Sequence, residues 1–597
     1  MCDMAAQAVA ECKYRFALRS PTGVSFGDFS ATIDPTKTKI ADPKVVDVAD
    51  QSITCAVVPE HAMYSPDGSL HAAATETGVI VRSLKAEEAE TPVSLFLPRQ
   101  KIVKMAFSPL GTYLVTWERQ TVKDAQNLFI WKVKNPEVRV TTPEAPSVPV
   151  ASFLRKIDAA HKVSWPLLAW SSDEHFCARM CAECIEILPG AVTSKSAQLM
   201  RIPARTVDYM EWCPVPERSS GEYRFRYLLA VFCLPRGSAE AGFVGIYDID
   251  PERYPAGSKK AVLPISERKF MQADSCVLNW NPAAGRGQPQ ALLATVCTDS
   301  DATGTTYYGT SELYILFADK PHLNGLVPCR KKGNIHDVAW SPDGKMFAVV
   351  YGYMPSMTSV FEMMPNGRSV LRGELGPLAR NVVKFSPDSR IIFIGGFGNL
   401  SGDMDFFDAK DFSVIGRANA HTTTQWEWSP DGAFLSCGVT APRRHMDNGF
   451  HIFSVNGQLV LSKYVPEMYD FQWEPCESMT RAVLQKPVPR PLPPPDREAR
   501  ITLPQSSSSP ATAAPTTVAQ EKYVPPHLRA AAAAAAASGP AKKEAPKTVS
   551  MQVYDRYGAV QPRNQQPPGG QQQASKPKSK KNKKRADTSM QMARREY

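Results

Sequence analysis

Short runs of apolar residues alternate with compact polar turns through the body of the chain, and the apolar runs have the length of β-strands. Typical runs are KMFAVVYGY from Lys345 and RIIFIGGF from Arg390. Both are rich in β-branched and aromatic residues and are bounded by residues that favour turns. Apolar positions spaced as on one face of an α-helix do not recur over any length before residue 485. The pattern therefore predicts an all-β fold.

One phrase recurs nine times: an aromatic residue, then a polar or proline-containing turn, then a strand. In its fullest form, S-P-D-G, proline presets the backbone, aspartate accepts local N–H groups and glycine adopts a left-handed conformation. Five of the eight spacings between the aromatic residues lie between 42 and 45 residues, close to the length of one four-stranded propeller blade. The repeat predicts a nine-bladed β-propeller with four-stranded antiparallel blades, in which each aromatic residue packs between neighbouring blades. These residues are Tyr64, Phe107, Trp170, Trp212, Trp280, Trp340, Phe385, Trp428 and Trp473.

The ends of the repeats indicate how the propeller closes. Each repeat is expected to end with a strand that mixes aliphatic and aromatic residues, such as LFIWKV from Leu128 or MDFFDA from Met404. A propeller has to close, because otherwise its first and last blades expose strand edges. The last turn, at Trp473, is followed by one clear strand, MTRAVLQ, before KPVPRPLPPP ends regular structure. The segment 13–26 is therefore predicted to be the strand that completes the ninth blade, in a propeller that spans residues 1–485.

Residues 486–597 have a different composition, dominated by Pro, Ser, Ala, Gln and Lys, with no Phe, Trp or Cys. Such a segment buries too little apolar surface to offset chain entropy, so it is predicted to be a disordered tail. It holds 20 Lys+Arg and 7 Asp+Glu, a net charge of +13. Since all 597 residues together carry +10, the first 485 carry −3. Attraction to polyanions is therefore assigned mainly to the tail.

Within the tail, residues 576–585 (KPKSKKNKKR) hold seven positive charges and no acid. Neutralising phosphates with such side chains releases counterions and gives salt-sensitive binding with little sequence preference. This cluster is the candidate RNA-binding or ribosome-binding site, and the alternatives are a solvated tail or a nuclear-import signal. Its cations are Lys576, Lys578, Lys580, Lys581, Lys583, Lys584 and Arg585.

A second island in the tail, YVPPHLR at residues 523–529, has the character of a short linear motif. Tyr523 and Leu528 match the start of the Tyr-x4-Leu ligand of the cap-binding initiation factor. Arg529, however, stands where that ligand has an apolar residue, and two prolines oppose the helix that it adopts. A linear motif for another partner is the preferred interpretation.

The cysteines offer the strongest alternative chemistry. The chain has 13 of them, an odd number without framework spacing, which is typical of reduced thiols in a cytosolic protein. Cys177, Cys181 and Cys184 have the C-x3-C-x2-C spacing that holds a [4Fe–4S] cluster in radical-SAM enzymes. They are predicted to lie in two adjoining strands, where alternate side chains point to opposite faces, so Cys181 and Cys184 are not expected to meet at one iron. Structural cysteines are the preferred interpretation.

No other motif indicates catalysis. Residues 395–402, GGFGNLSG, resemble a dinucleotide loop but precede a strand, not the helix whose N-terminus would bind phosphates. Their glycines are therefore expected to shape an inter-strand connection. No G-x4-G-K-[ST], HExxH or Cys/His zinc spacing is present, so no catalytic residue, cofactor or metal is predicted. The chain also lacks a signal-peptide pattern and the roughly 18 apolar residues of a membrane helix, which favours a cytoplasmic monomer without membrane contact.

The last three repeats resemble the eukaryotic translation initiation factor 2A family. The resemblance rests on residues 395–402, on Trp426-Glu427-Trp428, and on Ala441-Pro442-Arg443 followed by Asp447-Asn448-Gly449. It implies a nine-bladed propeller with a disordered C-terminal region, binding to the small ribosomal subunit, and GTP-independent delivery of initiator methionyl-tRNA. It also implies contacts with tRNA and mRNA that are made largely outside the propeller. Members of the family commonly end in a longer charged helical segment than this chain has.

The resulting hypothesis has two parts. The propeller is expected to dock on ribosomal protein or rRNA through its loops, with Arg443 and Arg444 as candidate contacts, unless these arginines pair with acids inside the eighth blade. The tail is expected to hold tRNA or mRNA, and other initiation factors are further expected partners. Two rival classes stay open. One is the b subunit of initiation factor 3, whose RNA-recognition domain would not fit ahead of Tyr64, and the other is a scaffold unconnected with translation.

Overall fold

The computed structural model describes residues 11–32, 44–53, 61–84, 94–120, 122, 124–134, 146–155, 165–193, 196–218, 225–236, 240–258, 260–299, 309–441, 443–475 and 501–502. Over these residues the secondary structure is β apart from one turn of 3-10 helix, η1 (Pro321–Leu323). The predicted strand MTRAVLQ, the motif with Tyr523 and Leu528, and the basic cluster 576–585 lie outside the described residues.

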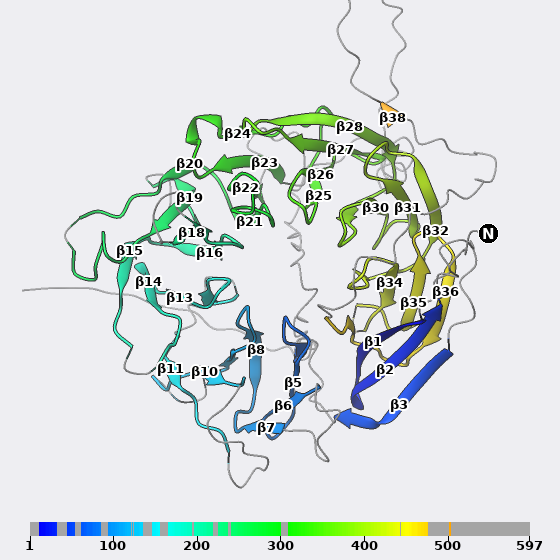
Figure 1. Cartoon of the computed structure of the whole chain (residues 1–597), viewed down its shortest axis with the longest axis horizontal. Coiled ribbons are helices and arrows are strands. Elements are labelled where there is room, and N and C mark those ends of the chain that lie inside the picture. Colours follow the sequence, from blue (N-terminus) through cyan, green and yellow to red (C-terminus); the bar gives the residue numbers. More distant parts are fainter. Residues whose placement is uncertain are drawn as a thin grey trace, which may run out of the picture. The chain divides into compact units, whose positions relative to one another are not determined.

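The described strands form nine antiparallel sheets arranged as the blades of a propeller (Figure 1). Eight of the blades follow the chain order, with the first strand innermost. The first four of these eight comprise β4 (Ala62–Tyr64), β5 (Leu70–Ala74), β6 (Val79–Ser83) and β7 (Ser94–Leu97); β8 (Ile102–Phe107), β9 (Tyr113–Glu118), β10 (Leu128–Lys132) and β11 (Ala151–Phe153); β12 (Leu168–Trp170), β13 (Phe176–Met180), β14 (Cys184–Pro189) and β15 (Met200–Pro203); and β16 (Val207–Trp212), β18 (Phe225–Cys233), β19 (Gly242–Ile249) and β20 (Ser266–Phe270), with β17 (Glu217–Arg218) paired to β18.

The other four continue around the axis in the same way. They comprise β21 (Ser275–Trp280), β22 (Ala291–Thr298), β23 (Thr310–Phe317) and β24 (Gly325–Leu326); β25 (Ile335–Trp340), β26 (Met346–Tyr351), β27 (Ser356–Met363) and β28 (Ser369–Leu378), with β38 (Ile501–Thr502) paired to β28; β29 (Val382–Phe385), β30 (Ile391–Gly395), β31 (Asp403–Asp408) and β32 (Val414–Asn419); and β33 (Gln425–Trp428), β34 (Phe434–Val439), β35 (Gly449–Ser454) and β36 (Leu459–Tyr464). The predicted fold class, an all-β nine-bladed propeller, is confirmed.

The strands that were expected to end each repeat are the third strands of their blades. LFIWKV and MDFFDA correspond to β10 and β31, and β11 and β32 follow them at the outer edge. The fourth strand was missed because it lies at the blade rim, outside the repeated aromatic-and-turn phrase that marks each blade. In β36, for example, none of the six residues is buried, although Leu459, Val460 and Leu461 are apolar.

A buried serine holds the turn between the first two strands of a blade. The Ser341 hydroxyl donates to Asp343 Oδ1 (2.7 Å) and accepts a hydrogen bond from the Met346 amide (2.9 Å), while Gly344 has a φ of 69°. The same serine–aspartate hydrogen bond occurs in four other blades. These pairs are Ser65 with Asp67, Ser171 with Asp173, Ser386 with Asp388, and Ser429 with Asp431.

Several of the tryptophans ahead of the turns link neighbouring blades, as predicted. The indole N–H of Trp212 donates to the carbonyl of Ala169 in the preceding blade (2.8 Å). Trp340 makes the same contact with Asn279 (3.0 Å). These indoles satisfy their donors on the neighbouring backbone, whereas Trp170 donates to a carbonyl of its own blade (3.0 Å).

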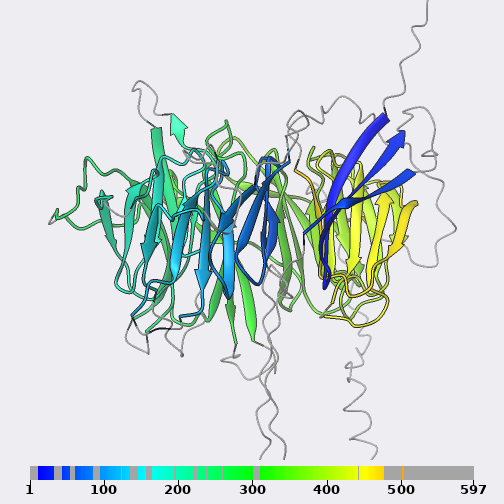
Figure 2. The ribbon, with the colours of Figure 1, turned by 90° about the horizontal axis from the view of Figure 1, so that it is seen from below.

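The ninth blade joins the two ends of the propeller. Its inner strand is β37 (Asp470–Trp473), and β1 (Glu11–Ser20), β2 (Gly23–Thr32) and β3 (Lys44–Ile53) follow outward. Phe16 pairs with Trp473 across β1 and β37. Both ribbon views show these N-terminal strands, in blue, beside the yellow strands β33 to β36 (Figures 1 and 2). Gln472 donates to the Ala62 carbonyl (2.9 Å), which connects this blade to the β4–β7 blade.

The segment 13–26 is not the single strand that the sequence analysis predicts. It is a hairpin in which Ser20 pairs with Gly23 and residues 21–22 form the turn. Pro21 and Thr22 make this a relative of the S-P-D-G turn, and Gly23 has a φ of 131°. The N-terminal segment therefore supplies three strands to the closing blade, because the hairpin returns the chain for a second pairing.

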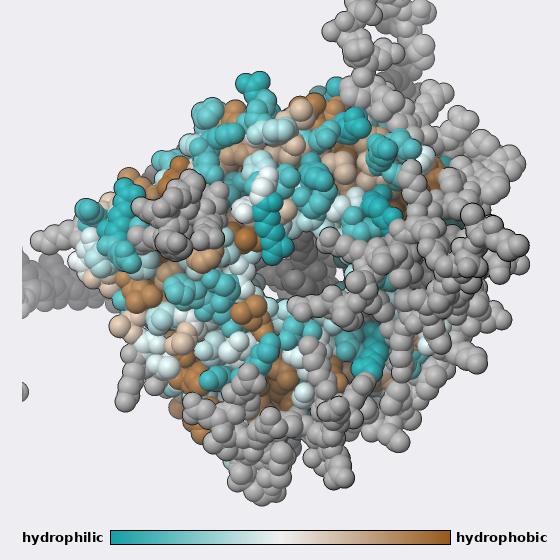
Figure 3. All heavy atoms as spheres, viewed as in Figure 1, coloured by the Kyte–Doolittle hydropathy of each residue, from teal (hydrophilic) through white to brown (hydrophobic). Residues whose placement is uncertain are grey.

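On the face of the propeller seen along the axis, hydrophilic (teal) residues surround small, separate patches of hydrophobic (brown) residues (Figure 3). Within the described residues, no helix has the length and apolar character needed to cross a membrane.

Candidate functional site

The antiparallel blades divide their loops between two faces. The turn between the first and second strands lies at the same end as the loop between the third and fourth, and the other loops lie at the opposite end. The five serine–aspartate turns all occupy one end, here called the turn face. The opposite end, here called the loop face, carries the glycine loop (residues 395–402) and the arginine loop (residues 441–449). Both loops belong to the family resemblance, so the loop face of the β29–β32 and β33–β36 blades is the candidate site.

The glycine loop connects β30 to β31 and folds back on itself. The Gly396 amide donates to the Asp403 carbonyl (2.9 Å), and the Gly402 amide donates to the Gly396 carbonyl (2.8 Å). A Cβ atom at Gly402, whose φ is 86°, would lie 2.4 Å from the Ala420 carbonyl oxygen. Only glycine fits such a close backbone approach. The prediction that these glycines shape an inter-strand connection is confirmed.

An asparagine and an aromatic pair anchor the glycine loop to its surroundings. The Phe397 amide donates to Asn381 Oδ1 (2.9 Å), and Asn381 Nδ2 donates to the Phe397 carbonyl (3.1 Å). The buried Phe397 ring lies 4.9 Å from the ring of Trp426. Because Trp426 belongs to the WEW segment, two separate parts of the family resemblance contact each other in the fold.

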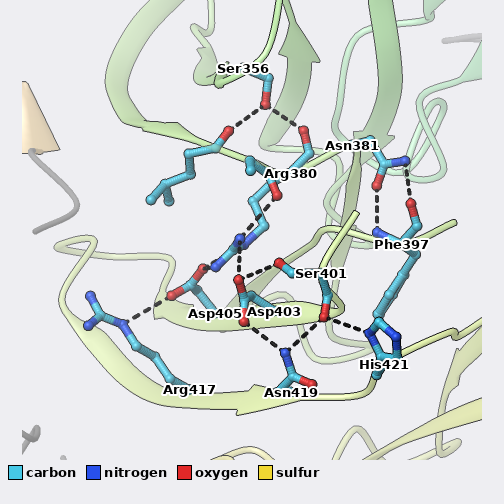
Figure 4. A network of polar contacts seen from close by, with 12 residues as sticks. Ser356, Arg380, Asn381, Phe397, Ser401, Asp403, Asp405, Arg417, Asn419 and His421 are labelled. Atoms are coloured by element: carbon cyan, nitrogen blue, oxygen red, sulfur yellow. Dashed lines mark hydrogen bonds and ion pairs between the residues drawn. The ribbon is translucent and has the colours of Figure 1, made fainter. Parts of the chain in front are cut away.

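A buried ionic network lies beneath the glycine loop (Figure 4). Asp405 accepts from Arg380 Nε (2.8 Å) through one oxygen and from Arg417 Nε (3.1 Å) through the other. Arg380 also lies 3.6 Å from Asp403 Oδ2. The side chains of Asp405 and Arg380 are only 3% and 9% exposed. These charges compensate one another, so the network supports the loop and is not itself a binding surface.

The upper edge of this network is exposed. The Ser401 hydroxyl donates to Asp403 Oδ2 (2.6 Å), and Asn419 Nδ2 donates to Asp403 Oδ1 (2.8 Å). His421 Nδ1 lies 3.3 Å from the Ser401 carbonyl oxygen. Figure 4 shows Ser401 and Asn419 beside Asp403, with His421 next to Ser401. Ser401, Asn419 and His421 are exposed, so they present a neutral polar rim to solvent.

The arginine loop is fixed at both ends and exposed in the middle. The buried Asn448 side chain donates to the Val439 carbonyl (3.2 Å) and the Arg444 carbonyl (2.8 Å). Residues 443–447 are all exposed. The Arg443 guanidinium lies beside the glycine loop, 3.9 Å from the point that a Cβ atom of Gly398 would occupy. The two loops are therefore neighbours on one surface.

The structure places both predicted arginines on the loop face. Arg444 is exposed, and its side chain forms no ion pair with any acid in the described ranges. The alternative that it pairs within its blade is therefore not supported by the described residues. The tail lysines, the other half of the predicted site, lie outside those residues, so the structure does not relate them to the loop face.

Sequence reasoning missed a second group of cations on the loop face. Arg330, Lys331 and Lys332 follow β24, in the loop that leads to β25. Arg330 pairs with Glu374 (3.7 Å), Lys331 donates to the Pro355 carbonyl, and Lys332 is exposed. Three consecutive cations in a body of net charge −3 were a detectable signal. The signal was overlooked because the tail has a far higher density of positive charge.

Two acidic residues in the inner strands next to this surface have raised pKa values. Burial raises the pKa of Glu427, in β33, to about 7. Burial also raises the pKa of Asp470, in β37, which accepts from Gln425 Nε2 (2.7 Å). Removal of a carboxylate from water disfavours its charged form. These acids lie where the β33–β36 blade meets the ninth blade, so their protonation affects stability more directly than binding.

The cysteine prediction is partly wrong. Cys181 and Cys184 are not held apart, because they face each other across a two-residue turn, with the Cys181 amide donating to the Cys184 carbonyl (2.9 Å). Their sulfurs and a carboxylate oxygen of Glu186 lie within 4.8 Å of one another, so these three residues could hold a metal ion. Cys177 is outside this group and is fully buried in the core. The three-cysteine set of a [4Fe–4S] cluster is therefore not assembled.

The fold and the two loops define a class: a nine-bladed propeller whose loop face carries distinct loops on the β29–β32 and β33–β36 blades. A family model described as eukaryotic translation initiation factor eIF2A matches residues 268–471, a stretch that contains the glycine loop, the WEW segment and the arginine loop. The chain is similar to the eukaryotic translation initiation factor 2A family over this stretch, which bears out the resemblance found in the sequence.

Relatives and a solved structure agree with this assignment. Eukaryotic translation initiation factor 2A of Dictyostelium discoideum is 28% identical over 421 residues, which cover 70% of this chain and 61% of that protein. The factor of Schizosaccharomyces pombe is 29% identical over 473 residues, with 78% and 70% covered. A crystal structure described as a eukaryotic initiation factor covers 78% of this chain and all of its own, with a TM-score of 0.58 and 26% identity.

The relationship to the rival family is more distant. The B subunit of eukaryotic translation initiation factor 3 from Xenopus laevis is 22% identical over 422 residues, which cover 70% of this chain and 54% of that protein. The match to the Dictyostelium factor leaves more than a third of that relative uncovered. The activity, substrates and partners of the whole factor therefore belong to the proposal below.

Proposed function

We propose that this chain is a cytoplasmic, non-enzymatic initiation factor that binds the small ribosomal subunit and delivers initiator methionyl-tRNA independently of GTP. The observation that carries the proposal is the contact between the family-specific segments on one surface. The glycine loop packs on Trp426 and lies beside Arg443, although these parts are far apart in the sequence. Interactions that position unique loops on a repetitive scaffold are typical of binding sites.

The charge distribution supports RNA as the ligand of the loop face. Asp403 and Asp405 are neutralised by Arg380 and Arg417. The exposed Lys332 and Arg444 therefore contribute positive charge that these buried acids do not cancel. An exposed cation can approach backbone phosphates of rRNA without breaking an internal ion pair. The loop face thus docks on the subunit through cations and the neutral rim formed by Ser401, Asn419 and His421.

The tail supplies the second contact. Its basic cluster, residues 576–585, holds tRNA or mRNA electrostatically, while the propeller docks on the subunit. Such binding tolerates many sequences and weakens as salt increases. The absence of a G-x4-G-K-[ST] motif from the sequence agrees with delivery that needs no bound GTP. Other initiation factors bind through short linear motifs such as residues 523–529.

Comigration with small ribosomal subunits in a density gradient tests the first part of the proposal. The full chain is expected to sediment with the subunit, and a variant with Lys332→Glu and Arg444→Glu is expected to dissociate at lower salt. Free sedimentation of the full chain at all salt concentrations would contradict the proposal and favour a scaffold outside translation.

Truncation after residue 486 tests the second part. Binding of initiator tRNA is measured across a salt series for the truncated and full chains. Loss of the tail is expected to lower the affinity and to reduce the slope of log K against log salt by about one for each phosphate that is no longer bound. An unchanged affinity and slope would refute the role of the tail while leaving docking through the propeller intact.

A further inference from the structure

We infer that Cys181, Cys184 and Glu186 form a binding site for one zinc ion on the β12–β15 blade. The site is independent of the loops discussed above and of the proposed role in translation. Their sulfur and carboxylate oxygen atoms lie within 4.8 Å of one another. Two thiolates and one carboxylate are suitable ligands for Zn²⁺, which accepts sulfur, nitrogen and oxygen donors in tetrahedral geometry.

The backbone places these three side chains on one face of the blade. Met180 pairs with Ile185, so Cys181 and Cys184 are directly opposite each other at the end of the β13–β14 hairpin. Glu186 follows Cys184 by two positions, and residues two apart in a strand point to the same side. The turn between the cysteines contains only Ala182 and Glu183, which gives the C-x2-C spacing typical of one half of a structural zinc site.

The spacing of the three groups is close to that of a metal site. In a tetrahedral site with Zn–S bonds of about 2.3 Å, the ligand atoms are roughly 3.5 to 3.8 Å apart. The sulfur and oxygen atoms here lie within 4.8 Å of one another, so small changes in side-chain torsion angles would bring them to that spacing.

Two arginines provide the outer contacts that such a site needs. Arg179 donates to Glu186 Oε2 through Nε (2.9 Å), and it pairs with Glu186 across β13 and β14. Arg201 pairs with Glu186 across β14 and β15, which places a second arginine beside the same residue. Hydrogen bonds to metal ligands orient them and adjust their basicity. The two guanidinium groups also lie where negative charge would accumulate.

The charges and protons of the proposed zinc centre balance. Zinc binding displaces one proton from Cys181 and one from Cys184, and Glu186 binds as the carboxylate. The resulting centre has a net charge of −1, which Arg179 compensates. Water completes the tetrahedral coordination. A cavity of about 690 Å³ lies beside the hairpin and is lined by Glu183 and Arg201, among other residues.

Metal content of the full-length chain tests this inference. The reduced protein is equilibrated with Zn²⁺, dialysed and measured by mass spectrometry of the metal. The wild-type chain is expected to retain one more zinc ion than a Cys181→Ser/Cys184→Ser variant. A Cys297→Ser/Cys329→Ser variant is the matched control, since both of these cysteines are also free and partly exposed, and it is expected to bind as the wild type does.

Cobalt gives an independent spectroscopic test. Substitution with Co²⁺ is expected to produce a thiolate-to-cobalt charge-transfer band in the wild type and in the control, but not in the Cys181→Ser/Cys184→Ser variant. If that variant does not fold, Glu186→Gln serves instead, with an expected loss of zinc affinity of roughly tenfold or more. Equal zinc content in the wild type and both site variants would overturn the inference. So would recovery of Cys181 and Cys184 as a disulfide from protein prepared with zinc.

Discussion

On the turn face, one contact recurs in five blades, whereas the glycine loop on the loop face is held by a combination of side chains particular to it. Five turns carry the same serine–aspartate hydrogen bond, and several of these aspartates use their other oxygen to reach a neighbouring blade. Tyr14, for example, donates to Asp431 Oδ2 (2.7 Å). The glycine loop instead combines the hydrogen bonds of Asn381 with a ring contact to Trp426.

This difference separates what maintains the fold from what makes the protein specific. A repeated contact stabilises every blade in the same way and cannot distinguish this propeller from another. The unique contacts of the loop face hold exposed groups in defined positions, which is what a binding surface needs. Substitutions on the two faces should therefore have separable effects on stability and on binding.

The largest effect is expected from Asp405→Asn, beneath the glycine loop. The substitution leaves Arg380 and Arg417 without their shared carboxylate in a buried setting, at a cost of about 3–5 kcal/mol in the free energy of unfolding. Urea-induced unfolding monitored by tryptophan fluorescence measures the loss. Asp447→Asn, in the exposed arginine loop, is the control and should change stability little. Equal midpoints for the two variants would mean that the network does not support the loop face.

A smaller loss of stability is expected from Ser341→Ala on the turn face. The substitution removes the hydroxyl that bonds Asp343 and the Met346 amide inside a buried turn, at a cost of about 1–3 kcal/mol. Ser413→Ala, at an exposed serine on the same face, is the control. If the two faces have separate roles, Ser341→Ala should bind small ribosomal subunits as tightly as the wild type does. Loss of binding without loss of stability would break that comparison.

A pH-dependent effect on stability is expected from Glu427→Gln. The pKa of Glu427 in the folded protein is about 7, above its ordinary value of 4.5, so the folded state retains the proton more strongly than the unfolded state. Its contribution to the free energy of unfolding therefore falls as the pH rises from 4.5 to 7 and is constant above that range. Thermal unfolding across this pH interval should show a decline in the wild type that is weaker in the variant. Identical pH profiles would contradict the assignment.

Charge reversal at the surface should leave stability nearly unchanged and distinguish the faces by binding alone. Arg444→Glu on the loop face is expected to weaken association with small subunits and to lower its salt dependence. Lys410→Glu is the matched control, because Lys410 is an exposed cation on the turn face of the neighbouring blade. Equal losses for both variants would indicate a general charge effect and not a defined surface.

The sequence by itself determined the repeating part of the molecule. Turn chemistry and aromatic spacing are local properties, so nine blades could be counted from single residues such as Trp340 and their neighbours. The family-specific segments were also visible as sequence. Two local features were not predicted: the outer strands, which lie outside the repeated aromatic-and-turn phrase, and the hairpin at residues 13–26, whose S-P-T-G turn falls within a segment predicted as one strand.

Only the tertiary structure decided which distant residues meet. The glycine loop reaches Trp426 and Arg443 because adjacent blades bring their loops to the same face. Asp405 receives two arginines because β31 lies between β32 and the loop that precedes β29. Cys181 and Cys184 meet because the chain turns between them, which strand alternation alone could not reveal. Contacts of this kind depend on strand pairing and on the angle between blades, and neither is a property of any one segment of the sequence.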